Sequence, residues 1–140
     1  HLRGAALPML LWQCFCFSLV TYMTPIHRLN VEPRYSDAAI YNGVVYLAGQ
    51  VPDDAHADMA TQTQQVLNTI DRLLQEAGSS KSRILMCQIF LADIADITVM
   101  NQVWDQWVDS ANSPPRATVQ APLADPQWKI EVVVTAAVGA

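Results

Sequence analysis

The chain has 140 residues, of which 51% are hydrophobic and 15% are charged, which suits one domain with a real core and excludes a disordered chain. Eight Lys and Arg residues stand against 13 Asp and Glu residues, for a net charge of −5. No basic run exists, so the electrostatic footprint of a nucleic-acid binder is missing and we expect no nucleic-acid partner.

The first 22 residues differ from the rest. Residues 8–22 form a nearly uncharged apolar stretch, shorter than the roughly 20 apolar residues of a transmembrane helix. The stretch resembles a signal-peptide core but lacks an initiator Met and a small-x-small cleavage site, whereas Met23 opens a segment that reads as an ordinary start. We interpret residues 1–22 as an artefact or a misassigned start, with an export signal or a genuine helical extension as alternatives. Residues 23–140 are expected to form a single domain without a membrane partner.

Two short β-type runs, residues 36–40 and 44–48, come next. Asn42-Gly43 lies between them, and this pair is typical of a two-residue hairpin because both residues tolerate positive φ. A helix is predicted over residues 58–77, since apolar side chains recur about every 3.6 residues, and Gly78 is the expected stop.

Residues 84–91 are apolar almost throughout, as in a central strand with both faces covered. A second helix is predicted over residues 97–111, where Trp104 and Trp107 belong to the apolar stripe. Two final strands, residues 116–121 and 129–138, complete the order β-β-α-β-α-β-β. We place both helices on one face of a mixed sheet. The other face then needs a cover, and an oligomer interface is the simplest one, because monomers rarely expose so large an apolar patch.

Two charged residues stand in the last two predicted strands. Arg116 opens a run that reads as buried sheet, and Glu131 is the carboxylate of the final strand. An unpaired buried charge is costly, so the guanidinium needs an anionic partner. That partner is either a structural carboxylate such as Glu131 or a ligand carboxylate held bidentately, and the residues alone leave both open.

The sequence offers no metal site and no cofactor motif. Cys14, Cys16 and Cys87 have neither disulfide-framework nor zinc spacing, and the three His residues lie far apart. The five Gly residues form no phosphate loop. We therefore expect no metal and no cofactor, read Cys87 as a small core residue, and take the cytoplasm as the default location.

Six short motifs occur in the order and at the spacing that a known protein family shows. They are YLAGQVP at 46–52, QTQQVL at 62–67, IFLADI at 89–94, Met100-Asn101, PRATV at 115–119 and KIE at 129–131. Through them the segment from Arg34 to Ala137 resembles the RidA/YjgF family of enamine/imine deaminases. The resemblance implies a chorismate-mutase-like α+β fold. It also implies a homotrimer whose sheets face inward as a barrel, with clefts between subunits.

The resemblance also implies roles for single residues. Arg116 would bind the substrate carboxylate, and Glu131 would place a water molecule or move a proton. Tyr35 and Asn101 would line the substrate-binding cleft. Gly49 is a further candidate because a glycine lets a ligand approach the backbone closely, although a plain turn explains it equally well.

Thr118 completes the candidate substrate-binding set. The best-known family members carry a reactive cysteine at its position and often Glu where this chain has Gln120. These departures place the chain in a divergent branch, in which substrates can differ.

The implied activity is hydrolysis of reactive enamine/imine intermediates of amino-acid metabolism to 2-keto acids and ammonia, as in a 2-iminobutanoate/2-iminopropanoate deaminase. One alternative is a non-catalytic trimeric binder of small keto acids or related carboxylates, which would keep Arg116 and tolerate loss of Glu131. Another is a chaperone-like or translation-associated protein, which would need neither residue. A ribonuclease role fits poorly with the acidic charge balance.

Overall fold

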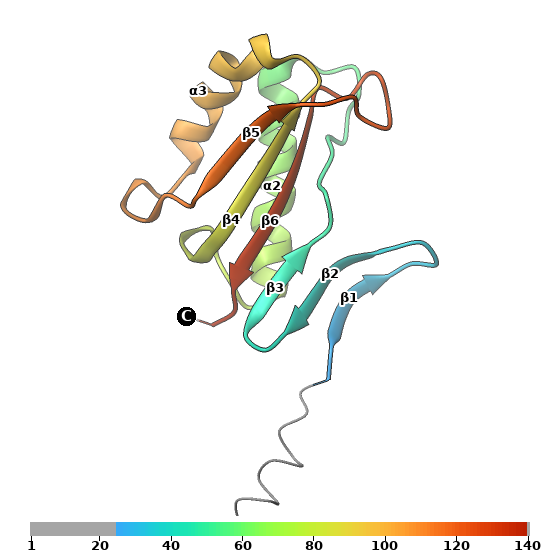
Figure 1. Ribbon diagram of the computed structural model, residues 1–140, viewed down its shortest axis with the longest axis vertical. Helices are drawn as coiled ribbons and strands as arrows, with labels where there is room; N and C mark the ends of the chain where they lie inside the picture. The colour runs from blue at the N-terminus through green and yellow to red at the C-terminus, as the bar shows by residue number, and fades with distance from the viewer. Residues whose placement is uncertain (1–24, 140) are drawn as a thin grey trace, which may run out of the picture.

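The computed structural model describes residues 25–139, so the interpretation of residues 1–22 falls outside the described part. Residues 25–139 form one mixed sheet of six strands with two helices on one face (Figure 1). The elements in chain order are β1 His27–Val31, β2 Ser36–Tyr41, β3 Val44–Leu47, α2 Met59–Glu76, β4 Ile84–Leu91, α3 Ile97–Trp107, β5 Arg116–Gln120 and β6 Ile130–Ala137. Short 3-10 turns occupy Lys81–Arg83, Ile94–Asp96 and Ser110–Asn112. The predicted mixed sheet with two helices on one face is confirmed.

The strand order across the sheet is β1-β2-β3-β6-β4-β5. Only the β4–β5 pair is parallel among the described strands, and α3 makes the crossover between them. In this register Cys87 of β4 lies opposite Arg116 of β5, and Phe90 of β4 lies opposite Glu131 of β6. The strand order therefore puts β4 between the two strands that carry the charged candidates.

Local signals explain the hairpin and the first helix. Asn42 and Gly43 both have positive φ, 52° and 79°, which confirms the predicted hairpin turn. Asp58 caps α2 by accepting a hydrogen bond from the Thr61 backbone N–H at 2.8 Å, and this bond lowers the pKa of the Asp58 carboxyl. Gly78, at φ 77°, follows the helix end as predicted.

The second helix is shorter than predicted. It ends at Trp107, and Val108 is already extended, with ψ at 141°. The Asp109 side chain accepts a hydrogen bond from the Ala111 backbone N–H at 3.1 Å and starts a 3-10 turn in place of another α-helical turn. Short Asp side chains compete in this way with the helical backbone pattern.

The strands differ from the prediction in two ways: one strand was missed, and another is more exposed than expected. Strand β1 was not predicted, because its sequence HRLNV is polar and mostly exposed. Among the described strands it pairs only with β2. Strand β5 was expected to be buried, but most of its residues are exposed. Within residues 25–139 it pairs with β4 alone, so it forms an edge of the sheet.

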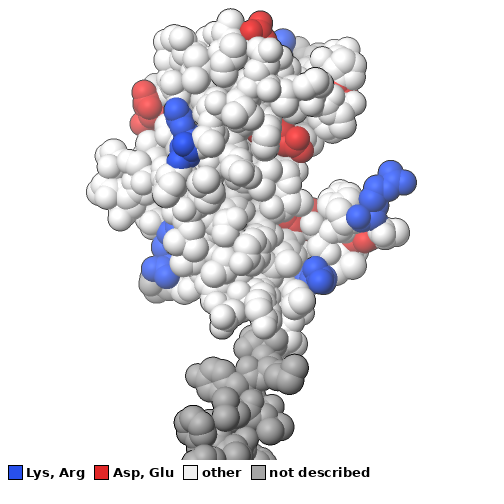
Figure 2. All heavy atoms as spheres, in the orientation of Figure 1, with Lys and Arg blue, Asp and Glu red and all other residues white. Residues whose placement is uncertain are grey.

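Within residues 25–139, the sheet face away from the helices is apolar and uncovered. Tyr41, Tyr46, Met86 and Val119 lie on it, each between 40% and 51% exposed. Figure 2, in the orientation of Figure 1, shows uncharged side chains across the middle of this face, with most charged ones toward its margins. A face of this kind is a candidate interface. Within residues 25–139, neither helix is both long and apolar enough to cross a membrane.

Candidate functional site

The first group of candidate residues surrounds Arg116 at the start of β5. Its Nη1 donates a hydrogen bond to Asn101 Oδ1 at 2.8 Å, and its guanidinium carbon lies 5.1 Å from the ring centroid of Trp104. Asn101 and Trp104 are three residues apart on α3, so they share one face of that helix. We call Arg116, Asn101 and Trp104 the arginine cluster.

Arg116 has no carboxylate partner among the described residues. The ion pair that the described residues contain joins two other side chains, Arg72 and Glu76 on the exposed side of α2, at 3.3 Å. The guanidinium has five N–H donors in a planar fork, and one nitrogen is engaged with Asn101. Because Arg116 is exposed, the rest of this fork is open to a ligand.

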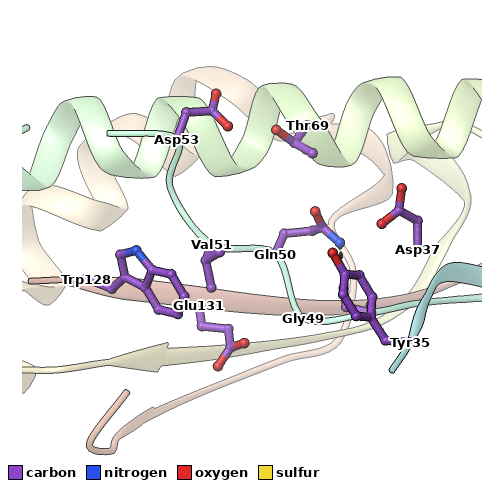
Figure 3. A pocket seen from close by; sticks show the side chains of 10 residues that line it. Tyr35, Asp37, Gly49, Gln50, Val51, Asp53, Thr69, Trp128 and Glu131 are labelled. Carbon is purple, nitrogen blue, oxygen red and sulfur yellow. Dashed lines mark hydrogen bonds between the residues drawn. The ribbon is translucent and has the colours of Figure 1, made fainter. Parts of the chain in front are cut away.

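The second group surrounds Glu131 on β6. A cavity of about 460 Å³ lies beside it, lined by Tyr35, Asp37, Ala48, Gly49, Gln50, Val51, Asp53, Thr69, Trp128 and Glu131. Figure 3 shows Thr69 reaching in from α2, whereas the Glu131 carboxylate points away from that helix. We call this space the Glu131 cavity.

Gly49 is the residue against which the Glu131 carboxylate packs. A Cβ added at Gly49 would lie 2.5 Å from Glu131 Oε1 and 3.1 Å from its Cδ. The next residue, Gln50, exchanges backbone hydrogen bonds with Val132 at 2.8 and 3.0 Å, which holds this segment against β6. The close approach expected at Gly49 is therefore made by Glu131 of the same chain.

The two groups lie on opposite faces of the sheet. Arg116 is opposite Cys87, which is buried under the helices, whereas Glu131 is opposite Phe90 on the uncovered face. They are two strands and three residue steps apart, which separates their Cα atoms by about 14 Å at standard sheet spacings. Arg116 and Glu131 therefore do not pair within one protomer.

Comparison with known proteins identifies the family. The sequence profile of the family described as Endoribonuclease L-PSP matches residues 25–138. The chain belongs to this family, also called RidA, YjgF or RutC.

Individual relatives agree with this assignment. A RutC family protein from Haemophilus ducreyi is 53% identical over 113 residues, which cover 81% of this chain and 97% of the relative. A crystal structure of a YjgF-family protein from Neisseria meningitidis has a TM-score of 0.80 at 42% identity, covering 83% of this chain and 97% of that one. A crystal structure from Salmonella typhimurium, described as a putative translation initiation inhibitor, has a TM-score of 0.75 at 46% identity, covering 81% and 97%.

Thr118 lies two residues beyond Arg116 on the same side of β5 in this RidA/YjgF-family chain. Its Oγ1 is buried and makes no hydrogen bond with the described residues. The hydroxyl is therefore shielded in the single chain, although the residue as a whole is half-buried. Cys87, the partner of Arg116 across the strand pair, is a core residue as predicted. Burial raises the pKa of its thiol to about 12, while the charge of Arg116 acts in the opposite direction.

Gln62 is a structural residue of the site that sequence reasoning missed. It is fully buried on α2, and its Nε2 donates to two carbonyl oxygens in the loop before α2 and to Gln127 O, at 3.1 to 3.2 Å. Its Oε1 accepts from Lys129 N at 2.8 Å. Gln62 thereby ties together two loops and holds the backbone on both sides of Trp128, a wall of the Glu131 cavity. Gln62 is the first residue of the QTQQVL motif, but it was not singled out because a glutamine in a helix normally faces solvent.

The described part of the RidA/YjgF-family chain contains no group of three or more His, Cys, Asp or Glu side chains placed to hold a metal ion. The first group offers an open guanidinium, which can bind an anion. The second offers a carboxylate beside a cavity, which can transfer a proton.

Proposed function

We propose that this protein hydrolyses reactive enamine/imine intermediates of amino-acid metabolism to 2-keto acids and ammonia, in the cytoplasm. The observation that carries the proposal is the Arg116 guanidinium. It is held by Asn101 and by the face of Trp104, has no carboxylate partner among residues 25–139, and is exposed. A planar fork of this kind suits the carboxylate of a 2-imino acid.

We also propose that the working site is assembled between subunits of a homotrimer. The imino carbon of a small 2-imino acid is one bond from its carboxylate, so one molecule cannot span the separation between Arg116 and Glu131 within a protomer. A cleft that joins the arginine cluster of one subunit to the Glu131 cavity of the next solves this problem. The uncovered apolar face supports such an assembly.

The proposed chemistry requires few groups. The enamine tautomerises to the imine. Water adds to the imino carbon while Glu131 accepts one water proton and passes it to the nitrogen, which gives the carbinolamine. Glu131 then accepts the proton of the carbinolamine hydroxyl and passes it to the nitrogen, so that the C=O bond forms as the C–N bond breaks, and ammonia and the 2-keto acid are released. Arg116 holds the carboxylate throughout, and positioning with one proton shuttle accounts for the catalysis.

The test is an assay of keto-acid and ammonia release, with enamines generated in situ from several amino acids. A bidentate charge pair in a partly dry cleft contributes about 2–4 kcal/mol, so Arg116→Ala should lower kcat/KM by roughly 30- to 1000-fold. Arg116→Lys keeps the charge without the fork and should recover only part of the loss.

Replacing the Glu131 carboxylate distinguishes a deaminase from a protein that only binds keto acids. Glu131→Gln keeps the size of the side chain and removes its ability to take up a proton, so hydrolysis should fall while keto-acid binding persists. Arg116→Ala with unchanged hydrolysis in a folded assembly would refute the catalytic assignment. Wild-type protein that binds keto acids but releases no ammonia would favour the binder.

A further inference from the structure

Trp104 is a core residue of α3 that also contacts an exposed side chain. Its side chain is 6% exposed and packs against Trp107, with ring centroids 5.3 Å apart and planes tilted by 53°. Its indole face also carries the Arg116 guanidinium at 5.1 Å. The residue therefore joins the packed interior to the exposed edge of the sheet.

We infer that Trp104 is a positioning residue, which fixes the plane of the Arg116 guanidinium so that its open edge is presented to a ligand carboxylate. This inference rests on the proposed function in that Arg116 is taken to bind the carboxylate. The buried Trp104 indole would thereby raise the affinity of Arg116 for the carboxylate of the substrate.

The physical reason is the geometry of the fork. Arginine is long and rich in rotamers, and Arg116 lies on an edge strand, so nothing on the outer side of β5 restrains it within the described chain. The hydrogen bond to Asn101 fixes one nitrogen but leaves rotation about that point. Contact with a flat indole face removes this rotation, and a bidentate carboxylate requires a defined guanidinium plane.

The same helix provides a matched control. Trp107 is 7% exposed, and the cation over its ring is Lys81, at 5.5 Å. Its Nε1 donates to Asp71 on α2 at 2.9 Å, so Trp107→Phe removes a partly buried hydrogen bond while keeping a ring against Trp104. This variant reports what general destabilisation of α3 does without touching Arg116.

The experiment compares Trp104→Leu, Trp104→Phe and Trp107→Phe with wild type. The first readout is the NMR resonance of the Arg116 Nε–H, which the ring current of Trp104 shifts in the wild type. The second is the affinity for 2-oxobutanoate, a keto acid of the class that the proposed reaction releases, and the third separates KM from kcat.

We expect Trp104→Leu to abolish the ring-current shift, to weaken 2-oxobutanoate binding and to raise KM, each binding effect about 3- to 10-fold, with kcat nearly unchanged. Trp104→Phe should lie between Leu and wild type, because the indole is the strongest cation–π partner. Trp107→Phe should lower the thermal midpoint but leave the resonance and KM in place.

An assembled Trp104→Leu variant with wild-type resonance and wild-type KM would overturn the inference. If that variant does not assemble, Trp104→Phe decides, and an unchanged resonance and affinity there would overturn it as well. If wild type and Arg116→Ala bind 2-oxobutanoate equally, the proposed function fails, and the role of Trp104 in substrate binding fails with it. Loss of binding in Arg116→Ala combined with no effect of either Trp104 variant rejects only the role of Trp104.

Discussion

Replacing Gly49 with alanine tests whether the Glu131 carboxylate must stay where the structure places it. The added Cβ would lie 2.5 Å from Glu131 Oε1, well inside ordinary van der Waals contact, so the carboxylate must move by about 1 Å. The backbone at Gly49 lies outside the left-handed region, so alanine introduces no backbone strain. The substitution therefore displaces one functional group and leaves the fold intact.

A misplacement of about 1 Å can cost about 100-fold in rate, so we expect Gly49→Ala to lower kcat/KM by that order. The assay is keto-acid release from enamines generated in situ, with the thermal midpoint measured in parallel. Gly43→Ala is the matched control. Gly43 has φ 79°, and an added Cβ there would meet no other group within 4 Å, so its variant should lose stability and keep kcat/KM. Full activity in a folded Gly49→Ala assembly would refute the role given to Glu131.

Three further predictions follow from the packing. Val119→Asp places a charge on the uncovered sheet face, so light scattering should show a trimer for wild type and a smaller species for the variant; a wild-type monomer at micromolar concentration contradicts the proposed assembly. In a Cys14→Ser/Cys16→Ser background, Cys87 should resist alkylation at pH 8 until the protein unfolds, because a thiol with a pKa near 12 is almost entirely protonated there; fast native labelling would show that it is accessible as thiolate. Thr118→Val replaces a buried hydroxyl that has no hydrogen-bond partner in the described part of the chain, so urea unfolding should show a gain of about 1 kcal/mol in the free energy of unfolding. A loss of stability would mean that the hydroxyl finds a partner in the assembly.

Local sequence signals explain which elements could be predicted. The continuous apolar run of β4 gave its bounds, and the Asn42-Gly43 pair gave the hairpin, because each depends on neighbours in the chain. Strand β1 lacks such a signal, since its residues are polar and exposed. The resemblance to the family named Asn101, and the close approach that a glycine permits named Gly49, but neither could say that their contacts are Arg116 and Glu131.

The relation between Arg116 and Glu131 could not be read from the sequence for a different reason. Their placement on opposite faces depends on β4 lying between β5 and β6 and on the register of both pairs. Strand order is a long-range property, and a shift of one residue would move either side chain to the other face. The exposure of β5 is a consequence of the same order.

The placement of Arg116 and Glu131 on opposite faces has a genetic consequence. If each cleft takes its arginine from one subunit and its carboxylate from the next, each inactivating substitution damages only one half of a cleft. Mixed trimers of Arg116→Ala and Glu131→Gln chains would then contain some clefts with both side chains intact, about a quarter of them after random assembly from equal amounts. Two alleles that are each inactive would complement one another, as they could not in a protein whose active site lay within a single chain.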